Sequence, residues 1–510
     1  MRGIYTNVND IRERVYEEVA RLSYEYNGDL SPMHRIPYDV IPGSVSNYRD
    51  SVFLERAIVR ERVRLAMGLN LRTIDEYNSM TDGAEECVQP EKYYQPPLIN
   101  IIKFACNRCP DNELHITDVC QGCLAHPCIE VCPKGAIKMV KGKSEIDQNK
   151  CVKCGKCKDV CPYGAIVKLE RPCAKACGMH CIGSDYYGYA DIDYDNCVSC
   201  GQCLAHCPFG AIADKAQIFQ VIQAIRQGEK VYAAIAPAVT GQFGKEMTPE
   251  KIRSAFKALG FEDAIEVAIG ADLCTIQEGE DFVEEVPAKM SFMGTSCCPA
   301  WAVMAKKQFP ELAHTISMAL TPMVLTGRLI KKSHPGCKVA FIGPCSAKKL
   351  EASRSSIRSD IDFVLTFEEV LGMLEAKDVK VSQLESGDCM HGASAAGRGF
   401  AVSGGVAEAV KEYIETKHPE KEFNIAKAEG LDECRKMLRL AKAGKYDGYL
   451  LEGMACPGGC IAGVGTVQPI NQTAKAIERH QKVSTAKQAV ESDFGHLVDE
   501  LSERDMMPPK

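Results

Sequence analysis

Cysteine dominates this sequence. The 510 residues include 27 cysteines, and 18 of these lie at or before Cys207. Disulfides explain such a density only in small secreted domains, and a chain of this length is not in that class. In a reducing compartment, closely spaced thiols are soft metal ligands. The spacing of the thiols therefore decides which metal the chain can hold.

Two cysteine runs share one spacing. In each, three cysteines with two residues between neighbours are followed, after three more residues, by a fourth cysteine and a proline. The two runs are Cys151, Cys154, Cys157 and Cys161, and Cys197, Cys200, Cys203 and Cys207; a looser third run is Cys120, Cys123, Cys128 and Cys132. Zinc sites usually pair two separated Cys-x2-Cys knuckles. The runs instead resemble bacterial ferredoxins, in which three thiolates hold one 4Fe–4S cube and the fourth ligates its neighbour.

Each run ends in the same way, as Cys132-Pro-Lys-Gly-Ala-Ile137 illustrates. A degenerate fourth copy, Cys177-Gly-Met-His-Cys-Ile182, keeps its last two ligand positions at Cys173 and Cys177 but lacks the leading pair, which Cys106 and Cys109 are expected to supply. Such repeats indicate small stacked modules rather than one large core.

Exchange of the fourth ligand between runs predicts up to four accessory cubes. The expected ligand sets are Cys120, Cys123, Cys128 and Cys161; Cys151, Cys154, Cys157 and Cys132; Cys197, Cys200, Cys203 and Cys177; and Cys106, Cys109, Cys173 and Cys207. The spacing alone admits two to four cubes, of which we favour four. Cys87 and Cys181 are left spare.

The distribution of residue types along the chain predicts a multidomain protein of the α+β and α/β classes. Residues 1–95 are expected to be helical, near 9–27 and 51–67, with a structural or docking role. Residues 96–212 form the ferredoxin-like modules, 213–470 a catalytic domain, and 471–510 a tail with a helix near 485–503.

In the third segment, helical stretches such as 214–227 and 250–259 alternate with short apolar runs, which is typical of α/β folds. The runs are Val231–Ala236, Ala264–Ile269, Met290–Met293, Lys338–Ile342 and Tyr449–Leu451. Sites in α/β sheets form at the carboxyl ends of strands. Three loops that follow such runs carry Cys298, Cys345, Cys456 and Cys460, the four thiolates that one cube needs.

Three motifs then identify a resemblance. Thr295-Ser-Cys-Cys-Pro-Ala-Trp301, Gly343-Pro-Cys-Ser-Ala-Lys-Lys-Leu350 and Glu452-Gly-Met-Ala-Cys-Pro-Gly-Gly-Cys460 resemble the three signatures of FeFe hydrogenases, in the same order. The likeness covers about 212–470 and is closest to the group called group B. It implies a ferredoxin-type hydrogenase with a two-lobed α/β catalytic domain that reversibly converts protons and electrons into H2.

The resemblance also implies a cofactor, the H-cluster. A cube on Cys298, Cys345, Cys456 and Cys460 would be bridged by Cys460 to a diiron subsite with carbonyl, cyanide and dithiolate ligands. Lys348 matches a lysine that holds a cyanide ligand by a charge-assisted hydrogen bond, and Met454 a methionine packed against the diiron unit.

Cys297 matches the thiol that passes protons to the dithiolate in that family. A free thiol titrates at about pH 8.5, which suits a proton carrier. The rest of the implied route is Asp281, Ser317, Glu278 and a water. Asp281 stands where the family often has glutamate. The alternative interpretation is that the carboxylates in 277–285 belong to a solvated surface and carry no protons.

Several neighbouring positions depart from the family pattern. Ala238 replaces a serine, Gly343 a methionine and Met323 a glutamine, and Ala462 and Val464 interrupt a glycine run. Such residues tune potential and reactivity, so direction, rate and oxygen tolerance stay open. Four further cysteines without ligand spacing are expected in the core: Cys274, Cys337, Cys389 and Cys434.

Charge and hydropathy limit the partners. A net charge of -7 gives no case for nucleic acid binding, and no apolar stretch is long enough to span a membrane. The N-terminus lacks the apolar core of a signal peptide, so the expected location is the cytoplasm. Expected partners are H2, protons, diiron-site maturation proteins and a ferredoxin-like electron carrier. An acidic carrier would dock on Lys150, Lys153, Lys156 and Lys158, unless these only form a solvated face.

Three alternatives remain. A non-catalytic relative in Fe–S assembly typically lacks the Cys297–Lys348 pair, which is present here. A hydrogen sensor would normally carry a signalling domain, and the motifs include none. The third alternative is a protein that only transfers electrons. Such a protein would have no need of the three cysteine-bearing loops in the second half of the chain.

Overall fold

The computed structural model describes residues 4–73, 75, 77–89, 95–387 and 392–502. Cys389 lies outside them. Within these residues, no helix has both the length and the apolar character that crossing a bilayer requires.

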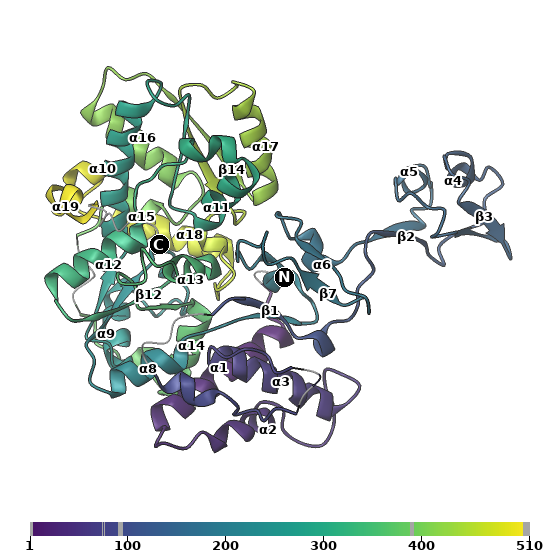
Figure 1. Ribbon diagram of the computed structural model, residues 1–510, viewed down its shortest axis with the longest axis horizontal. Coiled ribbons are helices and arrows are strands. Elements are labelled where there is room, and N and C mark those ends of the chain that lie inside the picture. The colour runs from purple at the N-terminus through teal and green to yellow at the C-terminus, as the bar shows by residue number, and fades with distance from the viewer. Residues whose placement is uncertain (1–3, 74, 76, 90–94, 388–391, 503–510) are drawn as a thin grey trace.

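The N-terminal region is helical, as expected from the sequence. It contains α1 (Asn7–Glu25), α2 (Ile36–Val40) and α3 (Val52–Ala66), so the helices predicted near 9–27 and 51–67 are confirmed. A reciprocal capping interaction between Thr6 and Asn9 begins α1. Helix α1 packs against α8 (Ile218–Arg226) and α14 (Phe367–Ala376), so this region is part of the main body (Figure 1).

Two small modules follow, each made of two antiparallel strand pairs and two short helices. The inner module, residues 98–109 and 170–214, contains β1 (Ile99–Ile101), α6 (Pro172–Lys175), β6 (Ile182–Ser184), β7 (Ala190–Ile192), α7 (Gln202–His206) and β8 (Ile212–Asp214). The outer module, residues 110–169, contains β2 (Glu113–Ile116), α4 (Pro127–Glu130), β3 (Ile137–Val140), β4 (Lys143–Ile146), α5 (Lys156–Asp159) and β5 (Ile166–Leu169).

The two modules are nested rather than consecutive. In the inner module β1 pairs with β8 and β6 with β7, all antiparallel, so the first and last strands of the module close it. In the outer module β2 pairs with β5 and β3 with β4. The outer module is inserted between Cys109 and Cys173 and projects from the body as an arm (Figure 1).

Two parallel sheets form the two lobes of the rest of the chain, which confirms the α/β prediction. The first has the order β10-β9-β12-β13, and the second β11-β15-β14. Their strands are β9 (Val231–Ile235), β10 (Asp263–Glu266), β11 (Met293–Gly294), β12 (Lys338–Ile342), β13 (Phe363–Leu365), β14 (Asn424–Glu429) and β15 (Tyr449–Met454). Strands of parallel sheets are buried on both faces, and β9, β13 and most of β12 and β15 are buried.

Helices cover both sheets. They are α8 (Ile218–Arg226), α9 (Pro249–Leu259), α10 (Ala268–Glu285), α11 (Pro299–Gln308), α12 (Pro322–Ser333), α13 (Ser346–Ala352), α14 (Phe367–Ala376), α15 (Ala395–Gly399), α16 (Gly405–Lys417), α17 (Leu431–Lys442), α18 (Ile470–Lys482) and α19 (Val498–Ser502).

Some predicted bounds were wrong. The apolar run Ala264–Ile269 is a strand only to Glu266, and α10 begins at Ala268. Of the helix expected near 485–503, the described residues contain only short 3-10 turns and the short α19, and the longer α18 ends before it at Lys482. The domain boundaries expected at 212 and 470 coincide with the first residues of β8 and α18, and they stay predictions.

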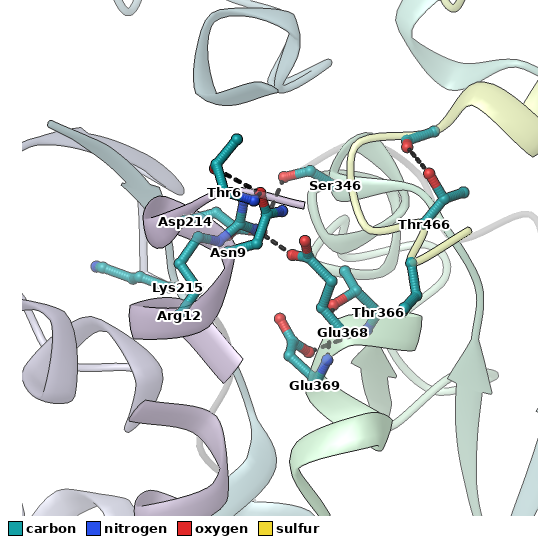
Figure 2. A network of polar contacts seen from close by, with 12 residues as sticks. Thr6, Asn9, Arg12, Asp214, Lys215, Ser346, Thr366, Glu368, Glu369 and Thr466 are labelled. Carbon is teal, nitrogen blue, oxygen red and sulfur yellow. Dashed lines mark hydrogen bonds and ion pairs between the residues drawn. The ribbon is translucent and has the colours of Figure 1, made fainter. Parts of the chain in front are cut away.

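A buried network of charges joins three parts of the chain (Figure 2). Arg12 of α1 pairs with Glu368 of α14, and both side chains are buried. Lys349 Nζ lies 2.8 Å from Asp214 Oδ2 at the end of β8 and 2.5 Å from Glu369 Oε1. The network therefore fixes the N-terminal helix and the inner module against the helix that follows Cys345.

Candidate functional site

Three strand-end loops meet at one cavity between the lobes. Strand β11 leads into 295–298, β12 into 343–345 and β15 into 454–460. The structure brings the four predicted ligands together, because Cys298, Cys345, Cys456 and Cys460 all line this space. We call it the central cavity.

Signature residues that do not line the cavity set the geometry of these loops. Trp301 donates from Nε1 to the carbonyl of Thr295 at 3.1 Å, and its ring covers Gly453, where a Cβ atom would lie 2.2 Å from it. The buried carboxylate of Glu452 accepts from the amides of Gly404 and Ala407, at 2.6 and 2.8 Å, and so binds the start of α16.

Two glycines bring the last ligands to one side. Gly458 and Gly459 have φ values of +97° and +86°, a region that side chains disfavour. A Cβ atom on Gly459 would also lie 2.5 Å from the amide nitrogen of Ser403. The turn between Cys456 and Cys460 therefore requires glycine.

The donor set fits an iron cluster. Burial raises the pKa of Cys345 to about 12, with further upward effects from Cys456 and Cys298, and burial raises the pKa of Cys460 well above its ordinary value. Thiolates in such an apolar wall require a cationic group to balance them, and iron ions supply that charge. Four thiols from three loops match the ligand number of one 4Fe–4S cube.

Lys348 adds a buried cation to the cavity wall. Its Nζ lies 2.8 Å from Glu351 Oε2, but the amine makes no directed hydrogen bond. Burial lowers the pKa of Lys348, and Glu351 reverses this effect, so that the pKa lies above its ordinary value. A charged amine with donors to spare fits an anionic ligand in the cavity.

Cys297, Glu278, Ser317 and Asp281 form one group beside the cavity. Glu278 is fully buried on α10 and accepts from the amide of Ser296 at 2.7 Å. Burial raises its pKa to about 7, the neighbouring Ser296 and Ser317 lower it, and the charge of Asp281 raises it. Burial, followed by the charge of Glu278, raises the pKa of Cys297, which lines the cavity.

The accessory cysteines also gather in sets. One pocket of the outer module is lined by Cys120, Cys123, Cys128 and Cys161, and a second by Cys132, Cys151, Cys154 and Cys157. A pocket of the inner module is lined by Cys106, Cys109, Cys173 and Cys207. Among the described residues, no three Cys, His, Asp or Glu side chains converge as ligands of a single metal ion do.

The remaining predicted set lies next to the central cavity. Burial raises the pKa values of Cys200 and Cys203, and the charges of the neighbouring Cys177 and Cys197 raise them further. Cys200 also lines the central cavity. Cys181, which was expected to be spare, lies beside this set, with its Sγ 3.5 Å from Cys177 Sγ. Cys87 is a core thiol, bonded to the carbonyl of Met67 at 2.9 Å.

Sequence reasoning missed residues that contact the site from a distance. Gln202 of α7 donates from Nε2 to Cys456 Sγ at 3.2 Å, and so joins the inner module to the central cavity. Phe341 fills the space of the missing side chain at Gly343, where a Cβ atom would lie 2.5 Å from its ring. Ala238, Met323 and Met454, which the resemblance implies lie around the cluster, line the cavity. Within the sequence nothing distinguishes Gln202 from an ordinary surface glutamine.

Comparisons with known proteins agree with this geometry. Residues 229–464 match the family described as iron only hydrogenase large subunit, C-terminal domain, and 144–167 and 190–213 match the 4Fe-4S binding domain. Iron hydrogenase 1 of Clostridium pasteurianum is 28% identical over 72% of this chain and 73% of its own length.

Two other relatives differ in kind. The periplasmic [Fe] hydrogenase large subunit of Nitratidesulfovibrio vulgaris is 31% identical over 64% of this chain and 86% of its own length. A probable cytosolic Fe-S cluster assembly factor of Aedes aegypti is 27% identical, over 44% of this chain and 58% of its own length.

Proposed function

Because this chain belongs to the iron-only hydrogenase family, we propose that it interconverts H2 with protons and electrons at an H-cluster in the central cavity. The observation that carries the proposal is which groups lie beside the four ligand thiols. Cys297 and Lys348 line the same cavity, which supplies a proton donor and a buried cation beside them.

The residues of the cavity take distinct roles in this proposal. Cys298, Cys345, Cys456 and Cys460 would hold the cube, and Cys460 would also hold the diiron subsite. Lys348 would donate hydrogen bonds to a cyanide ligand, and Met454, which is buried, would pack against the subsite. When bound, the H-cluster supplies the redox chemistry of making and breaking the H–H bond.

Protons travel along the group around Glu278. Asp281 is partly exposed, and it takes protons from solvent. Ser317 passes them to Glu278, whose pKa of about 7 lets it both accept and release a proton at neutral pH. Among the residues that the structure describes, Glu278 Oε2 has no hydrogen-bond partner, so it can accept from a water that links this carboxyl to Cys297 Sγ.

Electrons travel through four accessory cubes, on the ligand sets that line the inner and outer modules. The outer module is the point of uptake, because Cys154 is exposed there and Val152 is 53% exposed. Lys150, Lys153, Lys156 and Lys158 are exposed around the same run and attract an acidic, ferredoxin-like carrier. Diiron-site maturation proteins supply the subsite, and we place the protein in the cytoplasm.

The similarity to a cytosolic Fe-S cluster assembly factor favours one other function. In that case the protein would hold iron–sulfur clusters without turning over hydrogen. The two functions differ in whether a diiron subsite with carbonyl and cyanide ligands is bound.

The test uses full-length protein loaded with iron and sulfide and then with a synthetic diiron complex. We expect infrared bands of iron-bound carbonyl and cyanide, and H2 evolution from a reduced dye. Cys297→Ala should keep the bands but lose about 10²-fold or more of the turnover. Cys337→Ala, which removes a buried thiol outside the cavity, is the control and should behave as the unaltered protein. Full iron content without the bands would instead support an assembly role.

A further inference from the structure

Cys181 occupies a special position in the cysteine repeat. In the other three copies this position is alanine, at Ala136, Ala165 and Ala211. In two of them the alanine amide donates to the sulfur of the ligand four residues earlier, at 3.3 Å for Cys132 and 3.4 Å for Cys207. The fold therefore places residue 181 directly beside a cluster ligand.

The side chain at this position contacts two ligand thiols. Cys181 Sγ lies 3.5 Å from Cys177 Sγ and is also close to Cys197. Cys181 is 8% exposed, so the contact is enclosed by protein. Five thiols thus surround a site that offers four iron corners, whereas the other accessory pockets are each lined by four.

We propose that Cys181 is a reserve ligand of the cube held by Cys177, Cys197, Cys200 and Cys203, which we call the inner cube. In this role Cys181 is able to replace Cys177 on its iron. In the exchange the bond from iron to Cys177 Sγ breaks and a bond from iron to Cys181 Sγ forms. The proton of the Cys181 thiol passes to Cys177 across the 3.5 Å contact, so no oxidant or reductant is required. The proposal rests on the inner module holding a cube, not on hydrogen turnover.

The location of this cube gives the exchange a use. Cys200 lines the central cavity and Gln202 contacts Cys456, so the inner cube is the accessory cluster beside the catalytic site. A reserve thiol keeps this cube intact when one ligand bond opens. It also donates a hydrogen bond to the sulfur of Cys177, which stabilises the reduced cube.

The test compares Cys177→Ala, Cys181→Ala and the double variant in the loaded full-length protein. Cys173→Ala is the matched control, because it removes the neighbouring ligand of a four-thiol pocket in the same repeat. Iron content and the electron paramagnetic resonance signal of a three-iron cluster are measured. Both readouts are independent of hydrogen turnover.

We expect both single variants to retain all their iron and to show no three-iron signal. The double variant and Cys173→Ala should each lose iron or show that signal. Cys181→Ala should in addition lower the reduction potential of the inner cube. If Cys177→Ala behaves like Cys173→Ala, Cys181 is only a packing residue and the proposal fails; it also fails if Cys181→Ala alone loses the cube.

Discussion

Two adjacent cysteines in the first signature face different surroundings. Cys298 has extended backbone angles, φ −94° and ψ 104°, and successive side chains of extended backbone point to opposite sides. Cys298 lies near Cys345 and Cys460, whereas Cys297 is affected by Glu278, Cys274 and Glu452. A single turn of chain therefore reaches both the cluster site and the proposed proton route.

Glu278 should control the pH dependence of turnover. Its pKa of about 7 means that H2 production falls as pH rises through 7, because the protonated fraction falls, while H2 oxidation rises over the same window. Glu278→Gln keeps the shape but carries no proton, and should lower both rates about 10²-fold or more. Rates are measured in both directions across neutral pH.

The control for this variant is Glu280→Gln on the same helix, where the carboxylate binds Tyr413 and His418 away from the cavity. It should keep the unaltered profile. The raised pKa also predicts that Glu278 destabilises the fold as pH rises from the unfolded value through 7, and the glutamine variant should lack this loss. An unchanged inflection in Glu278→Gln would contradict the assignment.

Gln202 should tune the catalytic cube. Its hydrogen bond to Cys456 Sγ stabilises the reduced cluster, so Gln202→Leu should lower the reduction potential. A redox titration followed by electron paramagnetic resonance measures this shift. Gln148→Leu, which removes a bond to the carbonyl of Leu114 in the outer module, should leave the catalytic cube unchanged. Equal shifts in both variants would argue against a direct effect.

At the scale of elements, the sequence predicted two of the three strands that lead into the site, β12 and β15, whereas β11 shares only Met293 with the apolar run predicted there. Strand β12 coincides with its apolar run, and β9 and β15 overlap theirs closely. Strand β13 has three residues and β14 mixes charged with apolar residues, so neither forms a recognisable run. The join between β10 and α10 was misjudged because the same apolar residues suit a buried strand and a buried helix.

The position of each cysteine within its repeat, the repeat phase, predicts the ligand sets of the modules. It does not predict that one module is nested in the other. Repeat phase assigned Cys106 and Cys109 to Cys173 across the whole outer module, and these residues line one pocket. It treated Cys181 as spare, because repeat phase counts ligand positions and not the neighbours that a fold places beside them.

The lysines on and around α5 should govern association with the electron carrier. Changing Lys150, Lys153, Lys156 and Lys158 to glutamate should slow electron transfer from an acidic donor and invert its salt dependence, because attraction becomes repulsion. Stopped-flow rates at several salt concentrations measure this. The matched control changes exposed lysines elsewhere, Lys417, Lys436, Lys442 and Lys445. Salt dependence that is the same in both variants would exclude docking on this face.

At the scale of the molecule, the N-terminal helices are held by a long-range ion pair. Arg12 and Glu368 are distant in sequence, and both are buried. Sequence reasoning identified the helices but not their contact, because a pair this far apart leaves no periodic signal. The region therefore has the structural role that was one of its two expected roles.

Removing Arg12 should destabilise the body of the protein. Arg12→Ala leaves Glu368 buried without its partner, which costs about 3–5 kcal/mol of apparent unfolding free energy. Denaturant unfolding followed by the fluorescence of Trp301, the single tryptophan and a buried one, measures the loss. The double variant Arg12→Met and Glu368→Leu should recover most of it. A small loss in Arg12→Ala would mean that water reaches Glu368.

The nested modules impose an order of assembly during synthesis. Roughly 100 residues separate Cys106 from Cys207, so at about 5 to 20 residues per second the earliest ligands wait about 5 to 20 seconds for their last companion. Cys120 and Cys161 are far closer in the chain, and the outer arm can be complete while Cys106 and Cys109 are still unmatched on the ribosome. Iron would then be acquired from the periphery inward, and those two early thiols are the ones most open to oxidation before the chain is finished.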